Sequence, residues 1–192
     1  YRTSRMSTSF DSFEQLVRSR RTNLLIDNSR AVDPVLVDRL CGLVQWAPNH
    51  KRTWPWQIAV LTGSARDRLG AAMSADQADA GETDEARLAK TRRKYGRAPV
   101  VVAIATVPAE SDQRTAENRD AVAAGIQNLL LGATAIGLAG FWSSPPAPRG
   151  ARTLELCGFP ADAEFVALVY LGWPEQDVPV PERPAPDIHH LH

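Results

Sequence analysis

Two adjacent arginines followed by a hydroxyl residue form the first candidate anion site of the chain. Arg20, Arg21 and Thr22 stand at the end of the first predicted helix. Guanidinium groups and a hydroxyl all donate hydrogen bonds to anionic oxygens, so this triplet suits a phosphate group. Basic residues are also common at helix C-termini, because they complement the helix dipole. On its own, the triplet therefore fits either a phosphate site or an ordinary helix end.

A second candidate site is the aromatic and basic stretch from Trp46 to Trp56, which reads Trp-Ala-Pro-Asn-His-Lys-Arg-Thr-Trp-Pro-Trp. It holds three tryptophans and three potential cations, and its His50 is the only histidine before residue 189. Stacking surfaces beside cations suit a flat ring that carries a phosphate tail. The alternative is a rigid aromatic loop that anchors the following strand and leaves His50 exposed.

A third candidate site follows the longest predicted helix, where Trp142, Ser143 and Ser144 come directly after a glycine and a phenylalanine. Hydroxyls and backbone amides there can line a ring or a phosphate, although a plain strand-end turn explains the same residues. No Ser/His/Asp arrangement is evident, and His50 has no obvious orienting partner in the sequence. We therefore expect no side-chain nucleophile and no catalytic residue of that kind.

The composition is that of one ordinary globular domain spanning residues 1–192. Hydrophobic residues make up 44% and charged residues 23% of the 192 positions, which is enough apolar content for a core. Lysine plus arginine equals aspartate plus glutamate at 22 each, so no basic excess points to nucleic acid. We expect residues 1–9 to be a disordered or vector-derived start and residues 174–192 to form an extended tail.

Cysteine usage favours a cytoplasmic protein. Cys41 and Cys157 are the only cysteines, and their spacing predicts neither a disulfide framework nor a zinc site. No apolar signal-peptide segment is found at the start. Residues 121–147 carry no charge, but Gln127, Asn128 and many small residues in this run argue against a membrane span. We expect instead a helix buried in the core or between subunits.

The predicted elements follow a mixed plan with helices around one sheet. Helices are expected at about 11–20, 33–46, 117–137 and 151–156, and strands at 56–61, 99–106, around 141 and at 165–171. We expect Asp11 with Glu14, Asp33 and Ser64 to cap the first three helices. Residues 71–94 are polar and are expected to form a helical, solvated lid with a mobile middle. No glycine-rich nucleotide loop follows a strand.

Taken in order, these stretches resemble the nitroreductase family of FMN flavoproteins. The Arg20–Thr22 triplet resembles the family's Arg-Arg-Ser, and the Ala-Pro…Pro-Trp stretch at 47–56 resembles its Ala-Pro-Ser…Gln-Pro-Trp loop. The Ala-Pro-Asn-His-Lys form is most similar to a small single-domain, YdjA-like branch, which has Ala-Pro-Asp-His-Lys. Residues 124–138, 140–144 and 170–174 resemble the family's central helix, flavin-facing strand end and closing Leu-Gly-x-Pro motif.

The resemblance implies an α+β sandwich, with a central, mostly antiparallel sheet flanked by helices, a long buried central helix and an extended C-terminal arm. It implies a homodimer with FMN at the interface and an oxidoreductase that uses NADH or NADPH. Electrons would pass through flavin N5 by ping-pong hydride transfer to a small acceptor such as a nitroaromatic or quinone. The FMN contacts implied on this chain are Arg20, Arg21, Thr22, Trp46, His50, Trp142, Ser143 and Ser144.

Several positions depart from the family pattern and make the implied site more aromatic and less cationic. Leu24 stands where many members place a basic residue near flavin N1 and O2, and a cation there stabilises the reduced ring. Trp46 and Ser143 replace basic residues of the small branch, and Trp54 replaces a glutamine. These replacements predict altered FMN affinity, altered redox tuning and a different acceptor.

Three alternatives stay open on the sequence alone. The first is a flavin-binding storage or sensor protein with little turnover, and the second is a structural dimer whose motif is a relic. The third is a metal protein that uses His189, His190 and His192. No acidic or cysteine ligand has a fixed place beside these histidines, so we expect a disordered end or a cloning remnant there.

Overall fold

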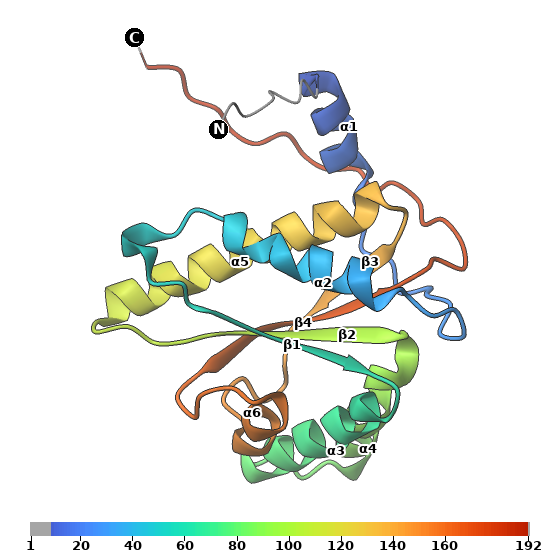
Figure 1. Ribbon diagram of the computed structural model, residues 1–192, viewed down its shortest axis with the longest axis vertical. Coiled ribbons are helices and arrows are strands. Elements are labelled where there is room, and N and C mark those ends of the chain that lie inside the picture. The colour runs from blue at the N-terminus through green and yellow to red at the C-terminus, as the bar shows by residue number, and fades with distance from the viewer. Residues whose placement is uncertain (1–8, 192) are drawn as a thin grey trace.

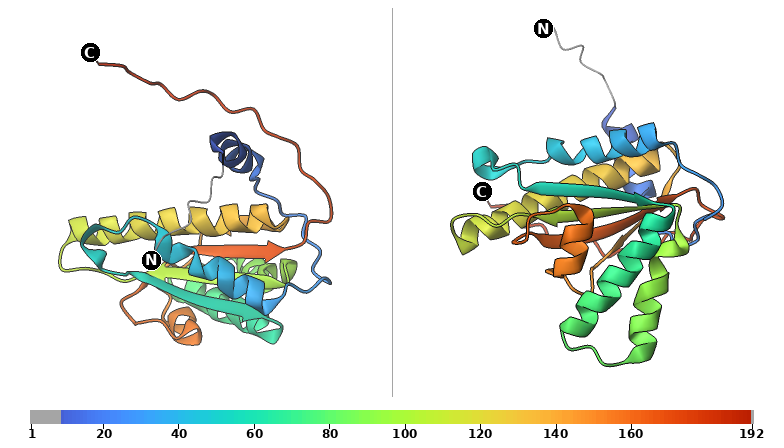
Figure 2. Two further views of the ribbon diagram at one scale, coloured as in Figure 1. Left: turned by 45° about the horizontal axis from the view of Figure 1, so that its top comes forward. Right: turned by 60° about the horizontal axis from the view of Figure 1, so that its bottom comes forward.

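A four-stranded antiparallel sheet separates two layers of helices in the computed structural model, which describes residues 9–191 (Figures 1 and 2). The strand order is β1 (Trp56–Thr62), β2 (Val100–Thr106), β4 (Glu164–Gly172) and β3 (Ala139–Ser143). All three neighbouring pairs are antiparallel. The expected α+β sandwich with a mostly antiparallel sheet is therefore confirmed.

The two central strands carry the core. Every residue of β2 is buried, and so is every residue of β4 after Glu164. Their continuous apolar runs face helices on both sides, which explains why no polar alternation is seen in the sequence. One face of the sheet packs against Val44, Ile126 and Leu129, and the other face packs against Leu69 and Met73.

The first layer consists of α2 (Pro34–Gly42) and the long helix α5 (Asp112–Ala135). Asp33 caps α2 as expected, since its carboxylate accepts from the amide of Val35 at 2.9 Å. The helix is shorter than predicted and continues as the 3-10 turn η1 (Val44–Trp46). By contrast, α5 begins five residues before the predicted start at Glu117. Its exposed first turns lack an apolar face that would mark them in the sequence.

The second layer consists of α3 (Ser64–Asp79), α4 (Glu85–Arg93), the 3-10 turn η3 (Lys94–Arg97) and α6 (Ala151–Cys157). The prediction of a solvated lid at 71–94 is wrong, because α3 packs on the sheet and α4 packs on α3. Gly70 permits this contact, since a Cβ there would lie 2.0 Å from the carbonyl oxygen of Arg92. Only residues 80–84 link the two helices. Gly63, rather than Ser64, is the N-cap of α3, so this helix has no side-chain cap at its start.

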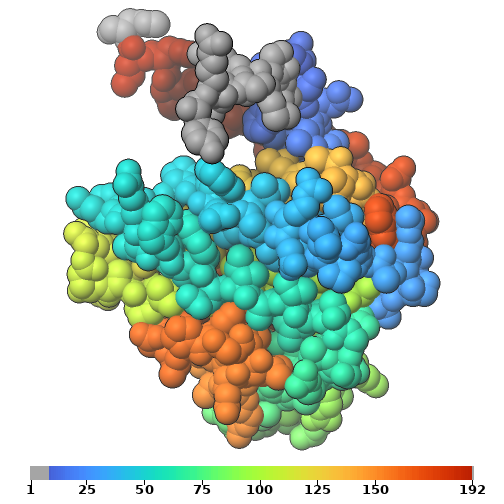
Figure 3. All heavy atoms as spheres, viewed as in Figure 1, coloured from blue at the N-terminus to red at the C-terminus, as the bar shows by residue number. Residues whose placement is uncertain are grey.

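The helix α1 (Phe10–Ser19) contacts α5 but packs only loosely on the rest of the fold. Its N-cap is Ser9, whose hydroxyl accepts from the amide of Ser12 at 3.2 Å, so the predicted Asp11 and Glu14 capping pair is wrong. None of its residues is buried. In the space-filling view, α1 and the C-terminal tail project beyond the packed body (Figure 3).

The tail contains no helix or strand between residues 175 and 191. Residues 1–8, to which the expected start was assigned, and His192 lie outside the described residues. Within the described part of the chain, no helix is both long and apolar enough to cross a membrane. The uncharged run at 121–147 is divided among α5, β3 and the loop after β3, so only its first half is helical.

Candidate functional site

The arginine triplet lies at the start of β3. Thr22 forms a parallel bridge with Gly140, and the amide of Asn23 donates to the carbonyl of Gly140 at 3.3 Å. A second bridge joins Ile26 to Pro174. These backbone contacts hold the segment after α1 against the edge of the sheet, beside the C-terminal end of α5, and bring the triplet near the tail.

Three guanidinium groups gather around the triplet. Burial lowers the pKa of Arg20 below its usual range, and the positive charges of Arg183 and Arg21 lower it further. The Arg21 side chain donates to the carbonyl of Arg20 at 2.8 Å and to the carbonyl of Arg18. Its Nε is buried and has no hydrogen-bond partner among residues 9–191. Within residues 9–191, neither Arg20 nor Arg183 donates a side-chain hydrogen bond, so the cluster has unused capacity for an anion.

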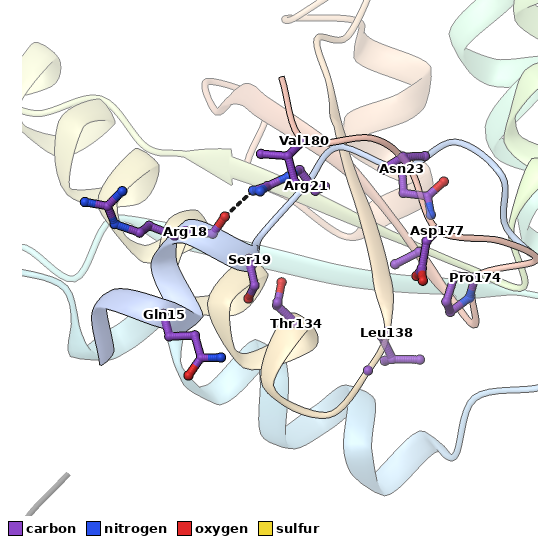
Figure 4. A pocket seen from close by; sticks show the side chains of 13 residues that line it. Gln15, Arg18, Ser19, Arg21, Asn23, Thr134, Leu138, Pro174, Asp177 and Val180 are labelled. Atoms are coloured by element: carbon purple, nitrogen blue, oxygen red, sulfur yellow. Dashed lines mark hydrogen bonds between the residues drawn. The ribbon is translucent and has the colours of Figure 1, made fainter. Parts of the chain in front are cut away.

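A cavity of about 550 Å³ opens beside this cluster (Figure 4). The segment after α1 contributes Arg21 and Asn23, and the end of α5 contributes Thr134. The tail closes one side with Asp177 and Val180. Asn23 links the two chain ends, because its side-chain amide donates to the carbonyl of Gln176 at 3.0 Å.

The loop after α2 presents His50 in a fixed orientation. Its Nδ1 lies 2.7 Å from a carboxylate oxygen of Glu117 on α5, in the 3-10 turn η2 (His50–Arg52). The expectation that His50 has no orienting partner is therefore wrong. The hydrogen bond from His50 lowers the pKa of Glu117, so the carboxylate is charged near neutral pH and Nδ1–H is the donor. The other ring nitrogen, Nε2, forms no hydrogen bond with any residue from 9 to 191.

The backbone of the same loop is unusual. Lys51, Arg52 and Trp54 have positive φ angles of 59°, 54° and 49°, a region that side-chain-bearing residues seldom occupy. Asn49 fixes this shape, because its side-chain oxygen accepts from the amide of Trp54 at 2.9 Å. The hydroxyl of Thr53 donates to the buried Asn118 on α5 at 2.5 Å. Loops held in such conformations are typical of binding sites.

The third stretch lies on β3 and just beyond it. Trp142 is paired with Val169 and packs on the α5 side of the sheet, while Ser143 is half-buried and Ser144 is exposed. Ser143 is three residues from Gly140, or about 10 Å along an extended strand. Because Thr22 forms a bridge with Gly140, β3 connects the triplet to this stretch.

The triplet and the His50 loop are not brought together within one chain. Thr134 lines the cavity beside Arg21, whereas Glu117 holds His50, and both lie on α5. At the standard rise per residue, these two positions are separated by about 25 Å of helix. One chain therefore supplies two separate parts of the predicted site.

Arg183 and Glu117 are the two site residues that sequence reasoning missed. Arg183 had a detectable signal, because it is the only lysine or arginine after Arg152. Glu117 had none, since it lies 67 positions from His50 and looks like any exposed helix carboxylate. Over residues 9–191, no group of three or more histidine, cysteine, aspartate or glutamate side chains is arranged to hold a metal ion.

Comparisons with known proteins place this fold and site in context. YdjA of Escherichia coli K12, whose name proposes an NAD(P)H nitroreductase, is 28% identical over 167 residues, covering 86% of this chain and 89% of YdjA. A nitroreductase-like family protein from Bacillus cereus has a TM-score of 0.77 at 23% identity, over 94% of both chains. A nitroreductase with bound FMN from Bacteroides fragilis has a TM-score of 0.74 at 17% identity, over 93% of this chain and 98% of its own.

A family model also matches the chain. The model described as the Nitroreductase family matches residues 17–173, which include the triplet, the His50 loop and all four strands. Because this match spans most of the chain, the protein belongs to the nitroreductase family.

Proposed function

We propose that this protein is a cytoplasmic, FMN-dependent oxidoreductase that moves electrons from NADH or NADPH to an electron-poor small organic acceptor, such as a nitroaromatic or quinone. The observation that carries the proposal is the cluster of Arg20, Arg21 and Arg183 at the head of β3. Family membership and the similar fold of the FMN-bound nitroreductase from Bacteroides fragilis support the same cofactor. Both cysteines are free, as suits a reducing compartment.

The cluster fits the phosphate group of FMN. Three neighbouring guanidinium groups repel one another, and a bound dianion relieves that repulsion while accepting their hydrogen bonds. The buried Nε of Arg21 has no partner among the described residues, so a ligand oxygen would satisfy it. The hydroxyl of Thr22, directly beside the cluster, would bind the sugar-like chain of the cofactor. The residues present therefore fit the group.

When bound, the flavin ring supplies the electron-transfer chemistry, and the protein supplies position, charge and a dry site. Trp142, Ser143 and Ser144 would line the ring, because β3 leads from Gly140 beside the phosphate cluster to these residues. Trp46 and His50 would approach it from another direction. No step requires a side-chain nucleophile.

A second copy of the chain is needed to complete this site. About 25 Å of α5 separates the two parts of the site in one chain, so His50 of one copy reaches the cofactor held by the other. If a two-fold axis relates the two chains, the dimer has two equivalent sites, because the same surface of each chain contacts the other chain.

The surface of the chain supports such a dimer. Phe10 and Phe13 on α1 are 75% and 52% exposed, which is unusual for two phenylalanines on one short helix. The outer face of α5 shows only uncharged residues beyond Asp120, including Gln127 and Leu131. An amphipathic helix with no fully buried residue in its own chain favours a partner surface.

An absorbance titration tests the proposed function. Protein mixed with FMN and desalted is expected to keep the oxidised flavin bands, to bleach with anaerobic NADH or NADPH, and to recover with a nitroaromatic or quinone. Bands that persist unbleached would favour the storage or sensor alternative. A colourless protein would rule out the FMN assignment.

The phosphate contact is tested by comparing FMN with riboflavin, which has the same ring without the phosphate. Arg20→Gln is expected to raise the Kd for FMN about 10- to 100-fold, the loss typical of a hydrogen bond to a charged group. The Kd for riboflavin should not change. Arg39→Gln, which removes an exposed arginine on α2, serves as the control and should leave both values unchanged. Equal losses for both ligands would contradict the assignment.

A further inference from the structure

A second cavity lies in the loop between α2 and β1. It has a volume of about 440 Å³ and is lined by Gln45, Trp46, Ala47, Asn49, Arg52 and Trp54. The indoles of Trp46 and Trp54 are 78% and 57% exposed. Tryptophan is seldom so exposed unless its ring serves a binding surface, because the indole contributes a large apolar area. We call this cavity the tryptophan slot.

A cation lies in the same slot without a counter-charge. The Arg52 guanidinium forms no hydrogen bond or ion pair with any residue from 9 to 191, and no carboxylate lines the slot. The nearest loop ion pair joins His50 to Glu117 and does not include Arg52. The slot therefore combines two apolar ring faces with one unsatisfied planar cation. Such a cation binds a carboxylate or similar anion with two parallel hydrogen bonds.

The slot is also built on a rigid backbone. Arg52 and Trp54 are two of the three residues with left-handed backbone, and the Asn49 and Thr53 hydrogen bonds described above hold that shape against α5. Conformations of this kind cost energy, so they persist where the surrounding contacts enforce them. A preorganised slot selects ligands by shape and charge, because it does not adapt to poor matches.

We propose that the tryptophan slot is the acceptor site and that it selects planar aromatic acceptors carrying an anionic group, such as aromatic carboxylates. The inference rests on the proposed function, because His50 on the same loop is the residue that reaches the flavin of the other copy. The indoles stack on the aromatic ring, and Arg52 binds the anionic group. Trp46 and Trp54, which stand where relatives have a basic residue and a glutamine, then set acceptor specificity.

The test compares two acceptors of nearly the same shape, the anionic 4-nitrobenzoate and the neutral 4-nitrobenzamide, with the FMN-loaded enzyme. The native enzyme is expected to show a kcat/KM at least tenfold higher for the carboxylate, as expected for a charge-assisted hydrogen bond. Arg52→Gln should remove this preference, because it lowers kcat/KM for the carboxylate much more than for the amide. Lys51→Gln, which removes the neighbouring cation outside the slot, is the matched control and should keep the preference.

Two outcomes separate this inference from the proposed function. If both nitro compounds are reduced at equal efficiency by the native and Arg52→Gln enzymes, the slot assignment is overturned and the oxidoreductase stands. If neither is reduced and bound FMN does not bleach with NADH or NADPH, the proposed function fails first. Benzoate, which cannot be reduced, should inhibit the native enzyme competitively and more strongly than benzamide. FMN content and circular dichroism of each variant confirm that it is folded and loaded.

Discussion

At the residue scale, the carboxylate of Glu117 decides how His50 is presented. The imidazole has two nitrogens, and the bond from Nδ1 to Glu117 leaves Nε2 as the one available to a ligand. Gln113 also donates to the Glu117 carboxylate, at 3.3 Å, and restrains it in turn. In the proposed site, Glu117 would therefore act on the cofactor only through His50, as a positioning residue.

Removing this restraint should weaken cofactor binding. Glu117→Ala is expected to raise the Kd for FMN about fivefold, the cost of one lost hydrogen bond, measured by quenching of flavin fluorescence. Glu117→Gln should retain most of the affinity, because its amide oxygen still accepts from Nδ1. Glu110→Ala removes a carboxylate near the same end of α5 without touching His50, and should have no effect.

The pH dependence of the pair follows from the lowered pKa of Glu117. A carboxylate whose pKa is lowered in the folded state contributes its full stabilisation at pH values above the ordinary pKa of 4.5. This contribution is lost as the pH falls through the lowered pKa. FMN affinity should therefore differ between the native protein and Glu117→Ala at pH 5 and above. A difference that vanishes already at pH 6 would contradict this role.

The two thiols should be unreactive in the folded protein. Burial raises the pKa of Cys41 to about 11 and that of Cys157 to about 12, against an ordinary value of 9.0. At pH 8 this leaves about 100-fold less thiolate at Cys41 than in an unfolded chain, so alkylation by iodoacetamide should be correspondingly slow. The folded state also holds these protons more tightly. The contribution of the Cys41 thiol to the free energy of unfolding is therefore fully present below pH 9 and is lost as the pH rises through about 11.

At the scale of elements, a side chain of α3 caps α6. Oδ2 of Asp76 accepts from the amide of Thr153 at 2.8 Å and from its hydroxyl at 2.6 Å, and Oδ1 accepts from the amide of Arg152 at 3.1 Å. The Asp76 side chain is only 3% exposed. A cap normally comes from the residue before the helix, but that residue is Gly150, whose Cβ would lie 2.3 Å from Asp76.

Losing this cap should destabilise the whole domain. Asp76→Ala leaves two helix amides and a hydroxyl unpaired in the interior, so the free energy of unfolding should fall by about 3 kcal/mol. Urea denaturation followed by circular dichroism measures the change. Asp79→Ala removes the exposed partner of Arg152 and should change stability little. If the free energy of unfolding fell by similar amounts in Asp76→Ala and Asp79→Ala, the cap would contribute nothing beyond surface charge.

Elements with a strong local signal could be predicted, and elements held by distant contacts could not. The apolar run of β2 and the Asp33 cap before a proline mark their structures within a few residues. The packing of α3 and α4 depends on Gly70 meeting a carbonyl 22 positions away, which no local pattern reveals. In the candidate site, the three stretches could be recognised in the sequence. The pairing of Glu117 with His50 and the position of Arg183 near Arg20 could not, because both depend on the folded chain.

At the scale of the whole molecule, α1 is expected to hold two chains together. Phe13→Asp places a charge on its exposed apolar face, so the dimer should dissociate into monomers, as measured by light scattering after size exclusion. The variant should also lose FMN, because each site then lacks its His50 loop. Ala86→Asp, on the exposed start of α4, is the control and should remain dimeric. A monomeric native protein that binds FMN fully would contradict the shared site.

Because the length of α5 keeps the two parts of the site apart in one chain, the affinity for FMN should depend on the protein concentration. In the proposed dimer every cofactor touches both chains, so cofactor binding and association are linked equilibria, and each strengthens the other by the same factor. The apparent Kd for FMN should therefore fall as the protein concentration rises through the dimer dissociation constant. A cell that produces more of this protein would therefore also raise the FMN affinity of the molecules that are already present.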